Sequence, residues 1–420
     1  MKDLYTKEDW IAVWIGFLLL GLSSILPMFP KMKTWSIDTI MFYSFESFSN
    51  SIVIFSIMVF LFALAVFFQK ENVKNFIFSF LLLVTLALVA QFLSAFELSR
   101  SYGFGYAFWA LFIGLFISNV IGIKKTILKS LKSELIIKTG LVLLGAEILF
   151  SKMLILGLPA LTVAWVVTPI VIIFMYYFGV KYLKLDDKLT IVIATATSVC
   201  GVSAAIACSS ACKAKKEILT LAVSMTLIFT VIMMIAMPAI VQFLDLDLMV
   251  GGAWIGGTLD STGAVVAAGA VLGQDAMDVA AIVKMIQNIM VGTVAFIVAI
   301  IWARDGNDGK KVSLSEIWVR FPKFILGFIT ASIVFSFIIY PVYGEIVVND
   351  ILEVSKSYRG LLFTLAFLAI GLESNFKELA NNVQDGKPIY LYIVGQSFNI
   401  VLTLFVAYLA FGGVLFDIIK

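Results

Sequence analysis

Histidine is absent from this 420-residue sequence, and charged residues make up only 14% of it. Soluble globular proteins carry about 25% charged residues, so this chain has too few to cover a surface that faces water. Without histidine, neither a serine–histidine pair nor a His-Glu-x-x-His zinc site can form. The sequence also has no Walker motif for nucleotide phosphates. These absences predict that the chain is neither an enzyme nor an ATP-driven pump.

Cysteine is scarce, with three residues in one small-residue segment: Cys200, Cys208 and Cys212. Three thiols cannot all pair within one chain, and their spacing is not the C-x-x-C of a metal site. We therefore expect no disulfide, no metal and no cofactor. The net charge of +3 is small and its basic residues are spread over short loops, so we expect no nucleic-acid partner.

Hydrophobic residues make up 61% of the chain, and its mean hydropathy is +1.06. Lipid must then be the solvent for most of the surface. Eleven apolar runs are long enough to span a bilayer: 10–28, 51–68, 76–96, 104–123, 136–155, 157–178, 217–243, 279–303, 322–345, 359–376 and 389–411. Segments 189–211 and 251–273 differ, because they are rich in Gly, Ala, Ser and Thr, which permit close packing and helix breaks. The sequence predicts an all-α polytopic membrane protein with about eleven full spans and two re-entrant or broken segments.

Basic residues set the orientation, because short cytoplasmic loops are enriched in Lys and Arg. Loops 124–138 and 304–323 carry the strongest basic clusters, which predicts a cytoplasmic N-terminus. If segment 189–211 re-enters, the lysines at 213–216 face the cytoplasm and the aspartates at 245–247 face outside. If it crosses, both placements reverse and oppose the charge rule. We therefore prefer re-entry, with an obliquely crossing broken helix as the alternative.

The predicted topology contains inverted repeats. Segment 189–243 is matched by 251–303 in the opposite direction, and the peptides LLGAEILF (143–150) and AIGLESNF (369–376) share Gly, Glu and Phe in register. Chance similarity in an apolar alphabet is the alternative explanation. Inverted repeats are typical of secondary transporters, which hold their substrate at the midplane between discontinuous helices.

Four blocks of sequence resemble the sulfate exporter family of bacterial inner-membrane proteins. They are KTGLVLLGAEILFSKMLILGLPAL (138–161), TSVCGVSAAIACSSACKAKKE (197–217), WIGGTLDSTGAVVAAGAVLG (254–273) with VAAIVKMIQNIMVG (279–292), and LAFLAIGLESNFKEL (365–379). The resemblance covers residues 104–411 and makes 104–420 the transporter domain, with 1–103 an additional or divergent N-terminal part. It implies the fold of the sodium/proton antiporter and bile-acid symporter superfamily, a homodimer, and export of sulfate or a related anion. The peptide LDSTGA (259–264) lacks the His and Gln of that family pattern, which leaves the substrate and any proton coupling through that His open.

Two helix breaks are the predicted substrate site. Helix N-termini carry about half a positive charge each and bind anions through their N–H groups. Gly201 and Gly263 lie where such breaks are expected, although small residues can also serve packing alone. The flanking hydroxyl groups are candidate donors: Ser198, Ser203, Ser261 and Thr262.

Ionisable and amide side chains inside spans complete the candidate site. Lys284 lies within a predicted span and is either the counter-charge of the anion or an ammonium that mimics a coupling cation, although its stem could reach the interface. Asp260 is its expected partner and could bind Na⁺ or H⁺, or simply cap a helix. Glu147 and Glu373 are candidates for charge compensation or for interface anchoring. The amides form a polar path or bond neighbouring helices: Gln287, Asn288, Gln396 and Asn399.

The sequence therefore predicts a secondary carrier of a small anion, such as sulfate or a sulfonate, that works by alternating access with Na⁺ or H⁺ as coupling ion. The alternatives are an anion channel and a cation-coupled carrier of a small carboxylate or bicarbonate. A carrier saturates and responds to a counter-gradient, whereas a channel gives fast, linear flux.

Overall fold

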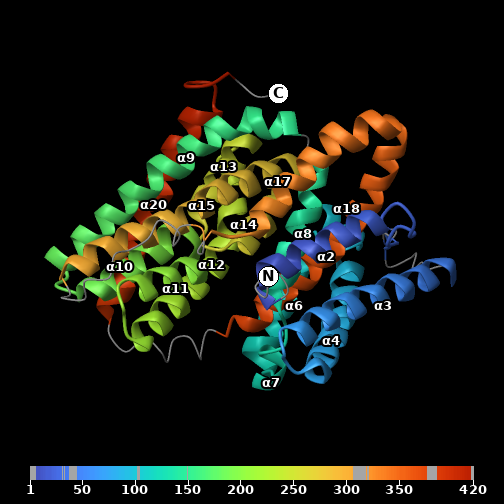
Figure 1. Cartoon of the computed structure of the whole chain (residues 1–420), viewed down its shortest axis with the longest axis horizontal. Coiled ribbons are helices and arrows are strands. Elements are labelled where there is room, and N and C mark those ends of the chain that lie inside the picture. Colours follow the sequence, from blue (N-terminus) through green and yellow to red (C-terminus); the bar gives the residue numbers. More distant parts are fainter. Residues whose placement is uncertain are drawn as a thin grey trace. The chain divides into compact units, whose positions relative to one another are not determined.

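The computed structural model describes residues 6–30, 32, 34–36, 45–101, 105–148, 150–305, 318, 321–375 and 386–417. Within these ranges the regular elements are helices (Figure 1), and the β-structure is one isolated bridge between Trp35 and Phe96. Eight helical runs among the described residues are long and apolar enough to cross a membrane. The prediction of an all-α polytopic membrane protein is confirmed.

Each expected span corresponds to a helix. The helices are α2 (Glu8–Leu22), α3 (Phe45–Phe68), α4 (Val73–Ser94), α6 (Tyr106–Phe116) with η1 (Ile117–Ile121), α8 (Ser133–Glu147), α9 (Phe150–Tyr177) with η2 (Phe178–Tyr182), α12 (Lys216–Phe243), α15 (Gln274–Asp305), α17 (Phe324–Val334) with η4 (Phe335–Ile339), α18 (Tyr340–Glu373) and α20 (Gly386–Phe411). Short helices α5 (Glu97–Ser101) and α7 (Lys125–Leu128) lie in connections. Gly344 has φ +76° and interrupts α18, because a left-handed residue cannot continue a right-handed helix. The stretch from α17 to α18 therefore provides two of the expected spans.

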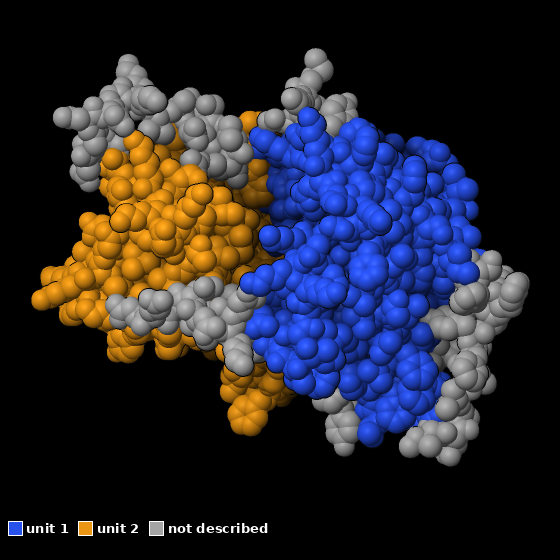
Figure 2. Space-filling model, turned by 90° about the horizontal axis from the view of Figure 1, so that it is seen from below, with its two compact units in different colours: residues 1–152, 323–375 blue, residues 153–322, 376–420 orange. Residues whose placement is uncertain are grey.

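The chain forms two compact units, each assembled from two separate ranges (Figure 2). Unit 1 contains Met1–Lys152 and Lys323–Asn375, and unit 2 contains Met153–Pro322 and Phe376–Lys420. The boundary expected after residue 103 lies inside unit 1 and stays a prediction.

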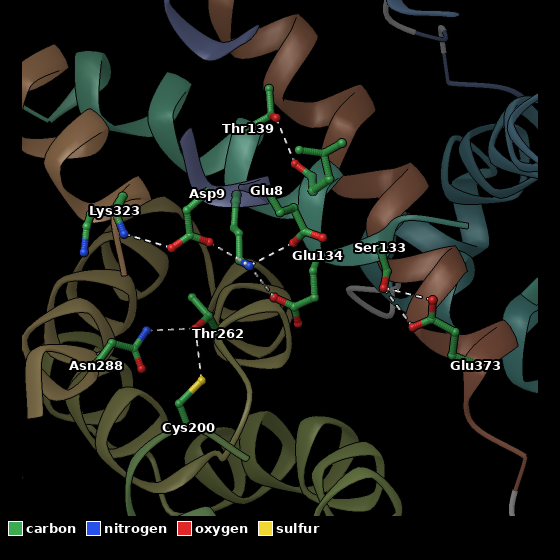
Figure 3. Close-up of polar contacts among 12 residues, drawn as sticks. Glu8, Asp9, Ser133, Glu134, Thr139, Cys200, Thr262, Asn288, Lys323 and Glu373 are labelled. Atoms are coloured by element: carbon green, nitrogen blue, oxygen red, sulfur yellow. Dashed lines mark hydrogen bonds and ion pairs between the residues drawn. The ribbon is translucent and has the colours of Figure 1, made fainter. Parts of the chain in front are cut away.

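Helices α8 and α18 pack closely in unit 1. A Cβ atom on Gly140 of α8 would lie 2.5 Å from the ring of Phe363 on α18, so this contact requires glycine. An ion cluster lies beside them, in which the ammonium of Lys138 contacts Glu8 at 2.9 Å and Asp9 at 3.0 Å. The backbone N–H of Lys323, just before α17, donates to Asp9 in the same cluster (Figure 3). Burial lowers the pKa of the Lys323 ammonium, and the Asp9 carboxylate opposes that shift.

Unit 2 contains the first re-entrant hairpin, made of α10 (Asp187–Thr195), η3 (Ala196–Cys200) and α11 (Gly201–Ala211). Its two ends meet, because the ammonium of Lys188 lies 3.4 Å from the carbonyl oxygen of Lys213. Nearer the tip, the thiol of Cys208 on α11 contacts the carbonyl of Ile191 on α10. The segment is thus long enough to cross, but it turns back on itself.

The second hairpin joins α13 (Leu248–Thr258) to α14 (Thr262–Leu272). Gly252 near the start of α13 and Gly269 near the end of α14 both approach Ala276 of α15. Built Cβ atoms would lie 2.5 Å and 3.4 Å from its carbonyl oxygen. The two ends of this segment therefore also lie together. Both small-residue segments fold back as hairpins, and the glycines of the second one allow its close packing on α15.

Candidate functional site

The tips of the two hairpins contact one another. The backbone N–H of Gly201, the first residue of α11, donates to the carbonyl of Asp260 at 2.7 Å. The thiol of Cys200 lies 4.0 Å from the hydroxyl of Thr262, the first residue of α14 (Figure 3). The starts of α11 and α14 are therefore neighbours in space, as the sequence predicts for the two breaks.

Lys284 lies at this crossing with only 1% of its surface exposed. Its ammonium donates to the carbonyl of Val199, to the carbonyl of Leu259 at 2.7 Å and to Oε1 of Gln287 at 2.7 Å. All three hydrogens of an ammonium are thus in use. Since Val199 and Leu259 lie at the ends of η3 and α13, where helix dipoles place partial negative charge, Lys284 compensates both C-terminal ends.

The interface position considered for Lys284 is not observed. Helix α15 begins at Gln274 rather than near residue 279, so Lys284 lies almost three turns into the helix. Its partners are buried backbone groups, and its stem does not extend to the surface.

Gln287 and Asn288 extend the network from the same part of α15. The amide nitrogen of Gln287 lies 2.9 Å from the carbonyl of Ser198, 3.1 Å from that of Gly257 and 3.1 Å from the hydroxyl of Thr168 on α9. The amide nitrogen of Asn288 donates to the hydroxyl of Thr262 at 3.0 Å. These two amides join both hairpins to α9 and α15.

Asp260 is buried between the two arms of the second hairpin, at 1% exposure. Its Oδ2 atom accepts a hydrogen bond from the hydroxyl of Tyr392 on α20, and its Oδ1 atom has no hydrogen-bond partner. The ring of Phe229 stacks on Tyr392 with centroids 4.4 Å apart. The expected pairing of Asp260 with Lys284 is not observed, because the ammonium is directed at backbone carbonyls.

Gln396 and Asn399 bond a neighbouring helix. Their amide nitrogens lie 3.0 Å and 3.4 Å from the carbonyl of Thr258, the last residue of α13. Of the two roles considered for these residues, the contacts match helix bonding. They fix α20 beside the second hairpin.

The predicted hydroxyl groups divide into buried and accessible ones. Ser198 is buried and donates to the carbonyl of Ala194 in its own helical turn at 2.7 Å. The second predicted glycine of the site, Gly263, is buried within α14. Ser203 is exposed and Ser261 is partly exposed.

Glu147 and Glu373 belong to unit 1 and not to the hairpin site of unit 2. Glu147 forms a buried ion pair with Arg359, whose Nε lies 2.7 Å and whose Nη2 lies 2.8 Å from the carboxylate oxygens. Glu373 contacts the hydroxyl of Ser133 at 2.8 Å and 3.0 Å (Figure 3).

Three contributors were missed from the sequence. Arg359 was detectable, because an ionisable residue near a predicted span is a functional candidate by default. Tyr392 and Thr168 gave no such signal, because tyrosine and threonine are ordinary residues in membrane helices. Their importance depends on partners far away in the sequence.

Comparison with known sequences places the chain in a family. The profile described as conserved hypothetical protein 698 matches residues 78–391. A UPF0324 membrane protein of Rhodopirellula baltica is 48% identical over 402 residues, which are 94% of this chain and 74% of the relative. Two UPF0324 membrane proteins of Nitratidesulfovibrio vulgaris are 48% identical over 84% and 83% of this chain.

This chain spans only 63% and 62% of the length of those two Nitratidesulfovibrio relatives. A further UPF0324 membrane protein, from Clostridium tetani, is 30% identical over 79% of this chain and 98% of its own length. No solved structure matches the chain. The long profile match and the high identities show that the chain belongs to the family of conserved hypothetical protein 698, together with these UPF0324 membrane proteins.

Proposed function

We propose that this membrane protein is a secondary active transporter that moves a small oxyanion, such as sulfate or a sulfonate, across the bacterial inner membrane by alternating access. The observation that carries the proposal is the contact of one buried ammonium, Lys284, with the carbonyls of Val199 and Leu259 at the hairpin breaks. An internal cation that neutralises the C-terminal ends of two half-helices leaves the neighbouring N-terminal ends to attract negative charge at membrane depth.

The electrostatics of the crossing support an anion. Lys284 compensates the C-terminal ends of η3 and α13, so the positive N-terminal ends of α11 and α14 are left to act on a ligand. Ser203 on α11 and Ser261 before α14 are accessible hydroxyl donors near these N-termini. Such donors replace part of the hydration shell that an oxyanion loses.

Unused acceptors at the same crossing support a coupling cation. Oδ1 of Asp260 and Oδ1 of Asn288 are buried without a hydrogen-bond partner. Buried polar atoms are almost always satisfied, so orphaned oxygens call for a proton, a water or an ion. Asp260 is therefore our candidate for binding H⁺ or Na⁺ in this unit. We further propose a homodimer with the N-terminus in the cytoplasm, from the family resemblance and the loop charges.

Uptake of labelled sulfate into proteoliposomes tests the proposal, with and without an imposed Na⁺ or pH gradient. We expect saturable flux in the wild type and its loss in Lys284→Ala. The matched control is Lys356→Ala, which removes an exposed lysine paired with Glu353 and is expected to keep full flux. Equal flux in wild type and Lys284→Ala would contradict a role for this ammonium.

The form of the flux separates the alternatives. Fast, linear flux without a counter-gradient response would indicate a channel. If sulfate does not move, a panel of sulfonates, small carboxylates and bicarbonate tests the rest of the anion class in the same vesicles. Absence of gradient-driven flux for every anion of the panel would overturn the proposal.

A further inference from the structure

In unit 1, helices α8 and α18 each end at a glutamate, and the two glutamates contact different groups. Ser133 and Glu147 are the first and last residues of α8, and Arg359 and Glu373 stand at the same spacing on α18. Glu147 contacts Arg359 while Glu373 contacts Ser133, so the two helices run antiparallel. One carboxyl thus meets a guanidinium, and its counterpart meets a single hydroxyl.

The contacts of Glu147 are those of a fully paired carboxylate. Two guanidinium N–H groups of Arg359 reach its two oxygens at 2.7 Å and 2.8 Å, and the side chains are 6% and 3% exposed. A bidentate pair of this kind supplies one hydrogen to each oxygen. The negative charge of Glu147 is therefore balanced where it lies.

Glu373 has too few hydrogens around it to be a satisfied carboxylate. Both of its oxygens lie within hydrogen-bond distance of the same atom, Oγ of Ser133, at 3.0 Å and 2.8 Å. A serine hydroxyl has only one hydrogen to donate. If the carboxyl carries a proton, its own O–H donates to Oγ while the serine O–H donates to the other oxygen. Both observed contacts are then hydrogen bonds.

The charges around Glu373 act in the same direction. Two carboxylates near it, those of Glu134 on α8 and Glu8 on α2, repel a negative charge on Glu373. Lys138 on α8 is engaged with Glu8, Asp9 and Glu134. The sequences of α6, η1, α17 and η4 contain no charged residue, and that of α4 contains only Lys74. The ion pairs of the described residues give Glu373 no cation.

We propose that Glu373, hydrogen-bonded to Ser133, is a proton-binding site of this protein, and that its proton is the coupling ion of the carrier. The second part of this proposal rests on the proposed function. The carboxylate takes H⁺ from water on one side of the membrane and returns it to water on the other, with no other bond made or broken. Coupling by Glu373 is the alternative to coupling by H⁺ or Na⁺ at Asp260.

Infrared spectra of the purified protein test the proton site without any substrate. We expect a carbonyl band of protonated carboxyl in neutral buffer, and the part of it that belongs to Glu373 should disappear in alkaline buffer and be missing in Glu373→Gln. Glu353→Gln, which removes an exposed carboxyl on the same helix, should keep the band. A band in wild type that survives unchanged in Glu373→Gln, or no such band at all, would overturn the proposal.

Two variants of Ser133 test whether it acts on the proton of Glu373. A purely structural role of Ser133 would give both variants the same infrared band. Ser133→Arg places at this end the group that Arg359 provides at the other, so the carboxyl should lose its proton and the band should vanish. Ser133→Ala should keep the proton but shift the band, because one hydrogen bond is lost. A persistent, unshifted band in both variants would contradict the contact between Ser133 and Glu373.

Coupling is measured in proteoliposomes by recording proton and anion movement together. We expect proton movement with the anion in wild type, and in Glu373→Gln at least a tenfold loss of proton movement with anion flux that no longer follows the pH gradient. Anion flux without proton movement in wild type would overturn the coupling role. If no anion moves in wild type, the proposed function fails and the coupling role with it, while the infrared result decides the proton site independently.

Discussion

At the scale of single residues, the ion pair between Arg359 and Glu147 makes a sharp prediction for stability. Removing one partner of a buried pair leaves the other charge without compensation, at a cost of about 3–5 kcal/mol. We expect Arg359→Leu to lower the free energy of unfolding in detergent by about that amount. Both side chains are nearly inaccessible, so solvent offers little relief.

The matched control is the double variant Arg359→Leu with Glu147→Leu. Replacing both charges by apolar groups is often nearly neutral, so the double variant should recover most of the lost stability. Denaturant titrations of the three proteins measure both effects. A single variant as stable as wild type would mean that Glu147 is compensated by another group.

Prediction from sequence at this scale depends on how unusual a residue is in its surroundings. Lys284, Gln287 and Asn288 are polar residues in an apolar run, and the structure joins all three to the hairpin tips. The partner of Asp260 was not predictable, because Tyr392 lies 132 residues away in the chain. A hydroxyl in a membrane helix gives no hint of which distant group it contacts.

At the scale of elements, the two hairpins make a prediction about accessibility. Lys188 and Lys213 lie at the open end of the first hairpin, with the ammonium of one beside the backbone of the other. In a background without the native cysteines, Lys188→Cys and Lys213→Cys should both react with a membrane-impermeant thiol reagent from the cytoplasmic side. Asp247→Cys, which precedes α13, should react only from the opposite side.

Labelling of positions 188 and 213 from opposite sides would show that the segment crosses the membrane. That outcome would restore the broken-helix alternative and contradict the folded hairpin. Labelling of positions 213 and 247 from one side would instead show that α12 does not span.

The sequence predicted the elements because length and hydropathy suffice to identify a span. It predicted their ends less well. Helix α8 is only 15 residues long. The residue before it, Lys132, has a left-handed backbone conformation with φ +53°. Nothing in the composition marks that turn, since such a conformation is unusual for lysine. The hairpin form of the first segment was predictable only from the charges of the flanking loops, because short cytoplasmic loops are enriched in Lys and Arg.

At the scale of the whole molecule, the chain leaves unit 1 after residue 152 and returns to it at residue 323. No local feature of the sequence marks these positions as boundaries, because membership in a unit depends on contacts between distant helices. The repeat of Gly and Glu near the ends of α8 and α18 was the one sequence sign that these helices belong together. Their exchanged end contacts agree with it.

The count of crossings gives a prediction for the whole topology. If all eleven expected spans cross and both hairpins return to their own side, the number of crossings is odd, so the N-terminus and the end of α20 face opposite sides. The basic loops place the N-terminus in the cytoplasm. A fluorescent protein that folds only in the cytoplasm should therefore be bright before α2, and alkaline phosphatase, active only outside, should be active after Gly412. If both reporters indicate the same side, one hairpin crosses alone or one helix fails to span, and fusions after Lys215 and Asp245 would identify which.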